Sequence, residues 1–342
     1  CDYCNSKING QYIVFEAKEY HEKCYKENII PKCTLCKKTL DGQYITHKGN
    51  GYHEYCYNNN ILPKCAFCNN IIYSQYIVHN NKDYHDSCYK DHILPKCSVC
   101  NYALETEYII DPWSNQYHKV HESETGNCNS CGRIISKKTS NNGYKLLDDR
   151  LICGICTKTK IETSNQIEDA RDYVLKLLAE YNLDNLQTNV PIELKNRNEL
   201  SKLRGKNSSE IRGFTYYNYM YNSKTGKIDE SSKTFKIYIL DNLPNLEFKS
   251  VLAHEYLHVW LHNENLDYNS SITEGFCNLA AALVYQDNIG DRFSEINLDG
   301  MLKNEDPDYG EGYRRIKSCL DRHGWNSLIK KMRSNDLSCF YN

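Results

Sequence analysis

Apolar and polar residues follow one pattern before about residue 157 and another after it. In the first part the apolar runs are short, and the sequence Gly-Gln-Tyr-Ile returns in near-copies at residues 10–13, 42–45, 74–77 and 105–109. Such a short alternation around a tyrosine predicts one strand of a small hairpin. The stretch that follows the first three copies, as at residues 24–33, predicts a turn of helix that a proline ends. This part therefore predicts a series of small hairpin modules.

The second part has the longer periods of a mixed domain. Residues 167–181 place apolar side chains at helical spacing, and residues 213–221 and 234–240 alternate as strands do. Residues 247–262 and 272–285 predict two further helices, the first of them buried. The predicted fold class is α+β, with small hairpin modules in front of a mixed domain.

Cysteine usage explains the first pattern. Fifteen of the 18 cysteines in the 342 residues lie before residue 157. Cys-x-x-Cys pairs begin 32 residues apart at Cys1, Cys33, Cys65 and Cys97, and a fifth begins 31 residues later at Cys128. A period of this length predicts a stacked or beaded array. We expect modules at residues 1–31, 32–63, 64–95, 96–126 and 127–160. One further domain covers residues 161–342, and its first residues, near 161–165, are expected to be a linker.

Each repeat supplies four metal ligands. A Cys-x-x-Cys pair and a second pair brought back by a hairpin can complete the tetrahedron that Zn²⁺ prefers. Disulfides are the alternative, but 15 is odd and histidine recurs in register with cysteine, which disulfides do not explain. We therefore predict five structural zinc ions and a reducing, cytoplasmic location. The ligand sets are Cys1, Cys4, His21 and Cys24; Cys33, Cys36, His53 and Cys56; Cys65, Cys68, His85 and Cys88; Cys97, Cys100, His118 and His121; and Cys128, Cys131, Cys153 and Cys156.

The modules resemble LIM zinc modules, which are protein-interaction domains. The resemblance covers about residues 1–156 and is carried by the Cys-x-x-Cys, the 16-residue spacer and the His-x-x-Cys of the first three modules. In a LIM domain a dipeptide separates the two zinc loops, whereas eight residues separate Cys24 from Cys33 here. Both the paired packing of a LIM domain and a string of single LIM-like modules therefore stay open. The resemblance implies a protein partner.

The charge of the array argues against nucleic acid. Residues 1–160 hold 20 Lys and Arg and 17 Asp and Glu, and five zinc ions on fifteen thiolates turn this small excess into a small deficit. Phosphate binding needs a basic face, so we expect a protein partner and no nucleic acid. No apolar run is long enough for a membrane span, so no membrane partner is expected.

The helix predicted at residues 247–262 contains a His-Glu-x-x-His motif formed by His254, Glu255 and His258. Histidines four residues apart lie on one helix face and can bind one metal ion, and the glutamate can act as base toward a metal-activated water. Taken alone the motif is weak, because two surface histidines on an amphipathic helix would look the same. The apolar residues on both sides oppose that alternative, since they make the helix a buried one.

Glu274 is the candidate third ligand. It lies sixteen residues after His258, and a helix–loop–helix of this length can return its carboxylate to the metal. Asn278, one turn later, is placed to orient a ligating histidine. His262 is too far from His254 along the helix axis to bind the same ion. The pattern resembles that of gluzincin peptidases, with one catalytic zinc ion.

Four stretches of the second part carry a closer resemblance: Asn242-Leu-Pro, Ser250-Val-Leu-Ala-His-Glu, Glu274-Gly-Phe-Cys and Tyr309-Gly-Glu-Gly-Tyr-Arg. Over roughly residues 165–335 the chain resembles the plant LIM-domain, ubiquitin-activated peptidases that limit organ growth, and their relatives. The resemblance implies a zincin-like domain that cleaves proteins. Ubiquitin or a ubiquitin-like protein is a partner that only the resemblance suggests, and the family's ubiquitin-interacting helix is not seen in this sequence. By match, the metal ligands are His254, His258 and Glu274, and the catalytic base is Glu255.

Tyr309 is the candidate for stabilising the oxyanion, with Tyr313 and His323 as alternatives, and a role for Tyr309 in the core or as a cap is equally open. By resemblance to gluzincins, residues 236–240 are expected to be the edge strand that binds the substrate backbone.

Some residues fall outside these patterns. His47, His79 and His92 lie outside the ligand register and are expected on loops or the surface, and Cys319 and Cys339 carry no pattern.

The sequence thus predicts a zinc-dependent protease that hydrolyses peptide bonds of protein substrates with a metal-activated water. The LIM-like modules would bind a protein partner or control the active site. The alternative is a LIM-type protein-interaction scaffold with an inactive peptidase domain. The intact motif argues against it, because decay would remove Glu255 early.

Overall fold

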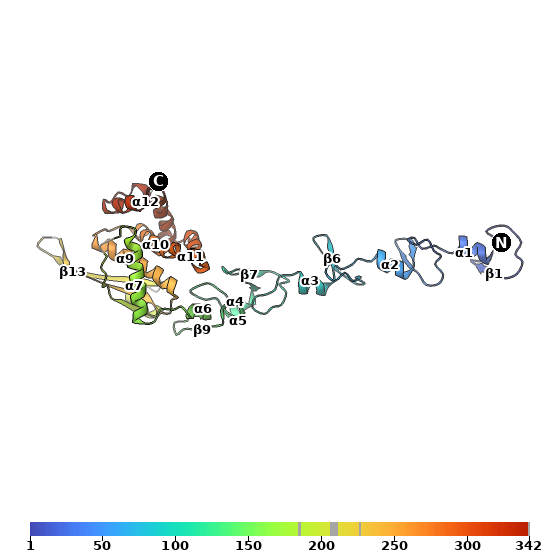
Figure 1. Ribbon diagram of the computed structural model, residues 1–342, viewed down its shortest axis with the longest axis horizontal. Helices are drawn as coiled ribbons and strands as arrows, with labels where there is room; N and C mark the ends of the chain where they lie inside the picture. Colours follow the sequence, from blue (N-terminus) through green and yellow to red (C-terminus); the bar gives the residue numbers. More distant parts are fainter. Residues whose placement is uncertain (184–185, 206–210, 226, 341–342) are drawn as a thin grey trace. The chain divides into compact units, whose positions relative to one another are not determined.

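The computed structural model describes residues 1–183, 186–205, 211–225 and 227–340, and Figure 1 traces its elements. The chain forms two compact units. One comprises Cys1–Lys96 and Ala103–Glu105, and the other comprises Cys97–Tyr102 and Thr106–Asn342. The first unit therefore holds the first three modules, and the second holds the fourth and fifth modules together with the mixed domain.

The first unit repeats one module three times: an antiparallel hairpin followed by a helix of seven residues. The N-cap residue of each helix is the ligand histidine, so the strand ends and the helix begins at the same ligand. The cysteine three residues later lies one helical turn further on the same face. The elements are β1 (Tyr12–Phe15), β2 (Lys18–His21) and α1 (Glu22–Asn28); β3 (Ile45–His47), β4 (Asn50–Tyr52) and α2 (Glu54–Asn60); and β5 (Ile77–His79), β6 (Lys82–Tyr84) and α3 (Asp86–His92).

The eight residues between consecutive zinc clusters are ordered in the same way each time. After α1, the Ile30 N–H donates to the Tyr25 carbonyl at 3.0 Å, and the Pro31 carbonyl accepts from the Leu40 N–H of the next module at 2.8 Å. Lys32 and Thr39 form a β-bridge. Equivalent bonds and bridges follow α2 and α3. The spacer therefore ends one module and forms the first β-bridge of the next.

Two of the three histidines expected on loops or the surface have a defined structural role. The Nδ1 atoms of His47 and His79 lie 3.2 and 3.1 Å from the hydroxyls of Tyr57 and Tyr89, on the helices of their own modules. These tyrosines therefore tie each helix to its hairpin. Both histidines are partly exposed, as expected of surface residues, but they lie at the ends of strands β3 and β5 and not in loops. A 32-residue repeat does not show which side chains meet within one module.

The fourth and fifth modules begin the second unit. The fourth contains β7 (Tyr108–Ile110), β8 (Gln116–His118) and α4 (Val120–Glu124). The fifth contains α5 (Lys137–Ser140), β9 (Gly143–Lys145), β10 (Leu151–Cys153) and α6 (Gly154–Thr157). Both keep the antiparallel hairpin. In the fifth, the four cysteines pack with Ile135 and Ile152 in a hydrophobic core.

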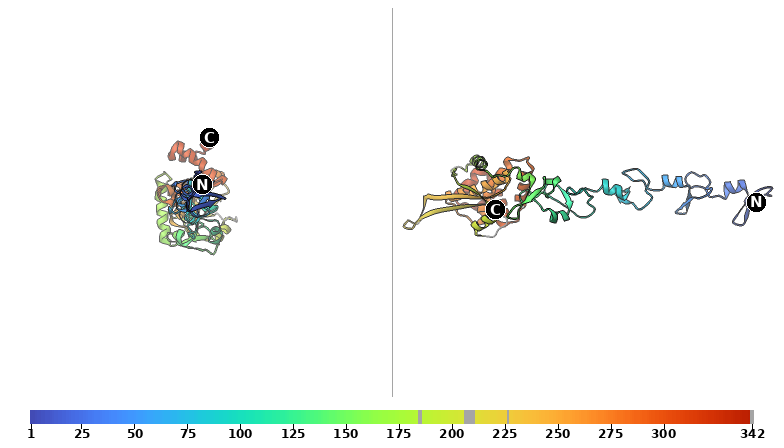
Figure 2. Two further views of the ribbon diagram at one scale, coloured as in Figure 1. Left: turned by 90° about the vertical axis from the view of Figure 1, so that its right-hand side faces the viewer. Right: turned by 90° about the horizontal axis from the view of Figure 1, so that it is seen from below.

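The mixed domain has a three-stranded sheet of order β11 (Ile192–Lys195), β13 (Lys227–Leu240) and β12 (Gly213–Asn222). β11 runs parallel to β13, and β12 runs antiparallel to it. Figure 2 shows the far end of the β12–β13 hairpin projecting beyond the helices. Residues 236–240 were expected to form an edge strand, but they lie in the central strand β13. The short strand β11 pairs with β13 on the side away from β12.

The helices pack around α9 (Asn245–Asn263) and α10 (Ser270–Asp287), whose side chains are largely buried. Trp260 and Phe276 are fully buried where these two helices meet, with ring centroids 5.6 Å apart. The other helices are α7 (Ser164–Ala179), α8 (Arg197–Arg204), α11 (Arg292–Lys303), the π-helix η1 (Pro307–Glu311), α12 (Gly312–Arg333), and the 3₁₀ turn η2 (Ser338–Phe340). Within the described residues, no helix is both long and apolar enough to cross a membrane.

One further expectation needs correction, and one disulfide adds to what the sequence shows. Residues 161–165 are not a linker, because Ile161 is buried in the core of the mixed domain and α7 already begins at Ser164. Cys319 and Cys339, which carry no sequence pattern, form a disulfide that ties α12 to the C-terminal turn. The sequence does not reveal this pair, because the two cysteines belong to no repeat.

Candidate metal centres

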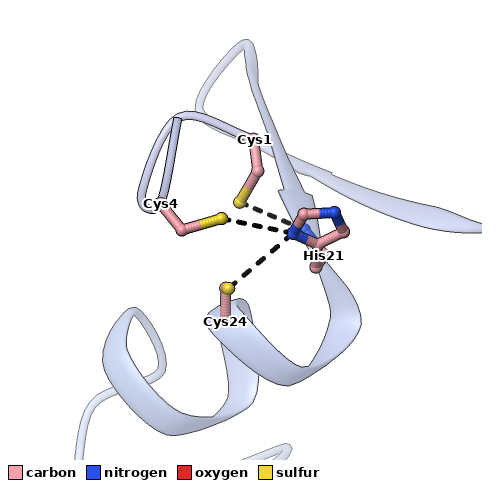
Figure 3. Close-up of side chains that lie close together, drawn as sticks. All are labelled: Cys1, Cys4, His21 and Cys24. Atoms are coloured by element: carbon pink, nitrogen blue, oxygen red, sulfur yellow. Dashed lines mark hydrogen bonds between the residues drawn. The ribbon is translucent and has the colours of Figure 1, made fainter. Parts of the chain in front are cut away.

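The structure brings each of the five predicted ligand sets together. Within each set the four ligand atoms all lie within 4.8 Å of one another. In the first module, which Figure 3 shows, the sulfurs of Cys4 and Cys24 lie 3.4 and 3.8 Å from Nδ1 of His21. In the fifth module the sulfurs of Cys131 and Cys153 are 3.8 Å apart.

These separations decide between a metal and a disulfide. A disulfide would bring two sulfurs to about 2.0 Å. Four ligands at zinc-bond lengths, in a tetrahedron, are about 3.3–3.8 Å from one another. The observed distances match the tetrahedron, so the clusters have the shape of a zinc site.

Backbone carbonyls set the tautomer of the ligand histidines in the first three modules. Nε2 of His21, His53 and His85 lies 3.2, 3.0 and 3.2 Å from the carbonyls of Lys7, Thr39 and Ile71, respectively. Nε2 therefore carries the proton and donates a hydrogen bond to the carbonyl. This leaves the Nδ1 lone pair directed at the cysteine sulfurs. Metal-binding histidines are commonly oriented in this way.

Burial predicts the order in which the clusters release metal. Cys4 and Cys36 are exposed, whereas no cysteine of the fifth cluster is more than 4% exposed. Since a chelator must reach the ligands, we expect the first two clusters to lose zinc first and the fifth to lose it last. A time course of zinc release to 4-(2-pyridylazo)resorcinol, with mapping of the freed thiols by alkylation, measures this order. Equal labelling rates for Cys4 and Cys128 would contradict it.

A sixth cluster of ligand atoms lies between α9 and α10. His254 Nε2 is 3.1 Å from Glu274 Oε2 and 3.2 Å from His258 Nε2, and His258 Nε2 is 3.5 Å from the same carboxylate oxygen. Nδ1 of His254 donates to Oδ1 of Asn278 at 2.9 Å, so its Nε2 lone pair faces the other two ligand atoms. Burial raises the pKa of Glu274, but the neighbouring imidazoles of His254 and His258 lower it on balance. The carboxyl is therefore ionised, as a metal ligand must be.

Glu255 lies on α9, the helix of His254 and His258, and is held by the edge strand β12. The Thr215 hydroxyl donates to Glu255 Oε2 at 2.7 Å, and the Glu255 side chain is buried. Beside it, the first residue of β12 is Gly213, where an added Cβ would stand 2.5 Å from Glu255 Oε1 and 2.7 Å from Val251. The strand therefore approaches Glu255 more closely than a side chain at position 213 would permit.

This close approach yields a prediction. We expect Gly213→Ala to displace the Glu255 carboxylate and to lower any hydrolytic rate that depends on this carboxylate about tenfold or more, with the zinc content unchanged. Gly300→Ala on α11 is the matched control, because an added Cβ there meets nothing within 4 Å. Steady-state rates and metal analysis of both variants measure the effect. Equal rates for the two variants would contradict it.

Tyr309 lies beside the ligand atoms, in the π-helix η1. Its ring stacks on that of His254 at a centroid distance of 6.1 Å, and its carbonyl accepts from Asn278 Nδ2 at 2.8 Å. Its hydroxyl accepts from Arg204 Nη2 at 3.4 Å. Burial and the Glu274 carboxylate raise the pKa of Tyr309 to about 12, so the hydroxyl keeps its proton at neutral pH.

The alternatives to Tyr309 lie elsewhere. Tyr313 is buried in the hydrophobic core, and His323 is exposed on α12 next to the kink at Gly324. Sequence reasoning missed Thr215 and Arg204. No motif marks either of them, and the alternation of residues 213–221 gives the strand but not the side chain that meets Glu255.

Comparison with known proteins identifies one part of the chain. A LIM domain model matches residues 1–61, which are the first two modules. LIM domains bind zinc and generally mediate protein–protein interaction, so the array is a set of zinc-binding hairpin modules suited to a protein partner. A search of the curated proteins found no match to the chain.

Proposed function

We propose that this protein is a zinc-dependent peptidase of the gluzincin type, with an array of LIM-like modules that binds a protein partner or controls the active site. The observation that carries the proposal is the convergence of His254, His258 and Glu274 from two helices, with Glu255 held beside them. Structural ion pairs alone do not account for two histidine nitrogens placed 3.2 Å apart, each facing the same carboxylate oxygen.

The donor set fits a catalytic zinc ion. Two imidazole nitrogens and one carboxylate oxygen at 3.1–3.5 Å from one another have the spacing of three corners of a zinc tetrahedron, with the fourth left for water. When bound, zinc supplies a Lewis acid and lowers the pKa of that water. His254, His258 and Glu274 would hold the ion, and Asn278 would keep the tautomer of His254 fixed.

The other side chains have roles in proton transfer and charge stabilisation. Glu255 accepts a proton from the attacking water and passes it to the leaving amine, with the Thr215 hydroxyl holding one of its oxygens. The Tyr309 hydroxyl and the Arg204 guanidinium lie together beside the ligand atoms, where they can stabilise the negative charge that develops on the substrate oxygen. The arrangement supports hydrolysis of peptide bonds in protein substrates.

The resemblance to the plant LIM-domain peptidases supports the same function and adds ubiquitin or a ubiquitin-like protein as a partner to test. We propose a cytoplasmic location, because fifteen ligand thiols must stay reduced until zinc binds them, although a reducing compartment disfavours a disulfide such as Cys319–Cys339.

Two measurements on the full chain test the proposal. We expect about six zinc ions per chain, and cleavage of fluorescently labelled casein that stops with 1,10-phenanthroline and returns with added zinc. A chain that holds zinc only in the five cysteine clusters and cleaves nothing would instead be the interaction scaffold.

A further inference from the structure

The end of the fifth module runs beside the residues that lead into α9. Lys160 forms a β-bridge with Pro244, and the N–H of Asn245, the first residue of α9, donates to the carbonyl of Thr159 at 2.8 Å. The N-cap residue Pro244 offers no side-chain hydrogen bond. Because the first N–H groups of a helix have no partner inside it, Thr159 of the fifth module supplies a cap that the sequence of α9 lacks.

A buried arginine strengthens this junction. Arg150 of the fifth module is 2% exposed, and its Nη1 donates to the carbonyl of Asp241 at 2.8 Å while Nη2 pairs with the Asp241 carboxylate. Its Nε donates to both carboxylate oxygens of Asp148 at 3.1 and 3.0 Å. The guanidinium thus joins a carboxylate of its own module to the loop between β13 and α9. Breaking such a buried pair is costly, because one charge is left without a partner.

The same ion cluster also holds the start of α8. The Asp148 Oδ2 accepts the N–H of Arg197, the first residue of α8, at 2.9 Å. The last residue of α8 is Arg204, which contacts the Tyr309 hydroxyl in the candidate site. The ion cluster of the fifth module therefore holds the beginnings of two helices that carry site residues, α8 and α9.

We propose that the fifth module is an internal part of the catalytic domain, and that Arg150 is a positioning residue for the His-Glu-x-x-His helix. Arg150 determines the position of α9, and so of Glu255, relative to Glu274 on α10. It also determines the position of α8 and Arg204. The inference deepens the proposed peptidase function and rests on it only for the kinetic readout.

The test compares Arg150→Met with Lys145→Met in the full chain. Lys145 is the matched control, because it forms an exposed ion pair with Asp149 in the same module. In Arg150→Met we expect hydrogen exchange at the amides of Asn245 and Arg197 to quicken about tenfold or more, with the zinc content unchanged. On labelled casein we expect kcat to fall about a hundredfold with KM little changed, because Arg150 does not line the site. Arg150→Lys should restore part of the loss, and Lys145→Met should behave as the wild type.

Unchanged exchange at both amides in Arg150→Met would overturn the proposal. Should Arg150→Met fail to fold, Asp241→Asn is measured by the same criteria, since it keeps the carbonyl contact of Arg150 and removes only the charge pair. If the wild type cleaves no casein, the peptidase function fails, while the exchange measurement still decides whether the fifth module positions α8 and α9.

Discussion

Replacing Glu255 with glutamine is expected to lower kcat about a thousandfold without loss of zinc or of stability. Glutamine has the same shape, and the Thr215 hydroxyl can still donate to its side-chain oxygen as it does to Glu255 Oε2. What is lost is the carboxylate that we propose as the proton acceptor for the attacking water. Rates on labelled casein, zinc analysis and a thermal unfolding curve together measure the effect.

Glu264→Gln is the control for this substitution. Glu264 follows the end of the same helix and pairs with Arg333 at 2.9 Å. An ion pair of this partly exposed kind contributes only about 0–1 kcal/mol, so activity and stability should stay close to those of the wild type. Equal loss of activity in both variants would show that any charge change at this helix is harmful, and would remove Glu255 as the base.

The second large effect is expected in the fifth zinc cluster. Cys153→Ser should remove one zinc ion and destabilise the second unit by more than about 4 kcal/mol, since the binding free energy of structural zinc is also folding free energy. Cys153 is fully buried, and its module shares a hydrophobic cluster with Phe293 of α11. Denaturant unfolding followed by tryptophan fluorescence, together with zinc analysis, measures the loss.

Cys4→Ser is the matched comparison. Cys4 is exposed, and it belongs to the first unit, which forms no part of the compact body that holds Cys153. The Cys4→Ser variant should lose one zinc ion, and the unfolding midpoint of its second unit should equal that of the wild type. Equal shifts of that midpoint in the two variants would contradict the assignment of the fifth module to the second unit.

The array could be predicted well because its information is local. A 32-residue step and the spacing of Cys1, Cys4, His21 and Cys24 determine which side chains can meet, and the structure brings those four together. The helix expected at residues 247–262 is observed at Asn245–Asn263, since its apolar residues form a long and regular pattern.

The parts that could not be predicted depend on contacts between distant segments. Arg150 and Asp241 are 91 residues apart, and neither belongs to a motif. The central position of β13 depends on the four-residue strand β11, which is too short to show a strand period. In the same way, Thr215 is one polar residue in an alternating stretch until the fold places it against Glu255.

The most direct test of the central claim is the analysis of cleavage products in H₂¹⁸O. Casein is incubated with the zinc-loaded full chain and, separately, with the Glu255→Gln variant purified in the same way, and new C-termini are identified by mass spectrometry. We predict new C-termini labelled with ¹⁸O for the wild type and almost none for the variant. The same labelled products in equal amount from both proteins would contradict the claim that peptide bonds are hydrolysed at this site.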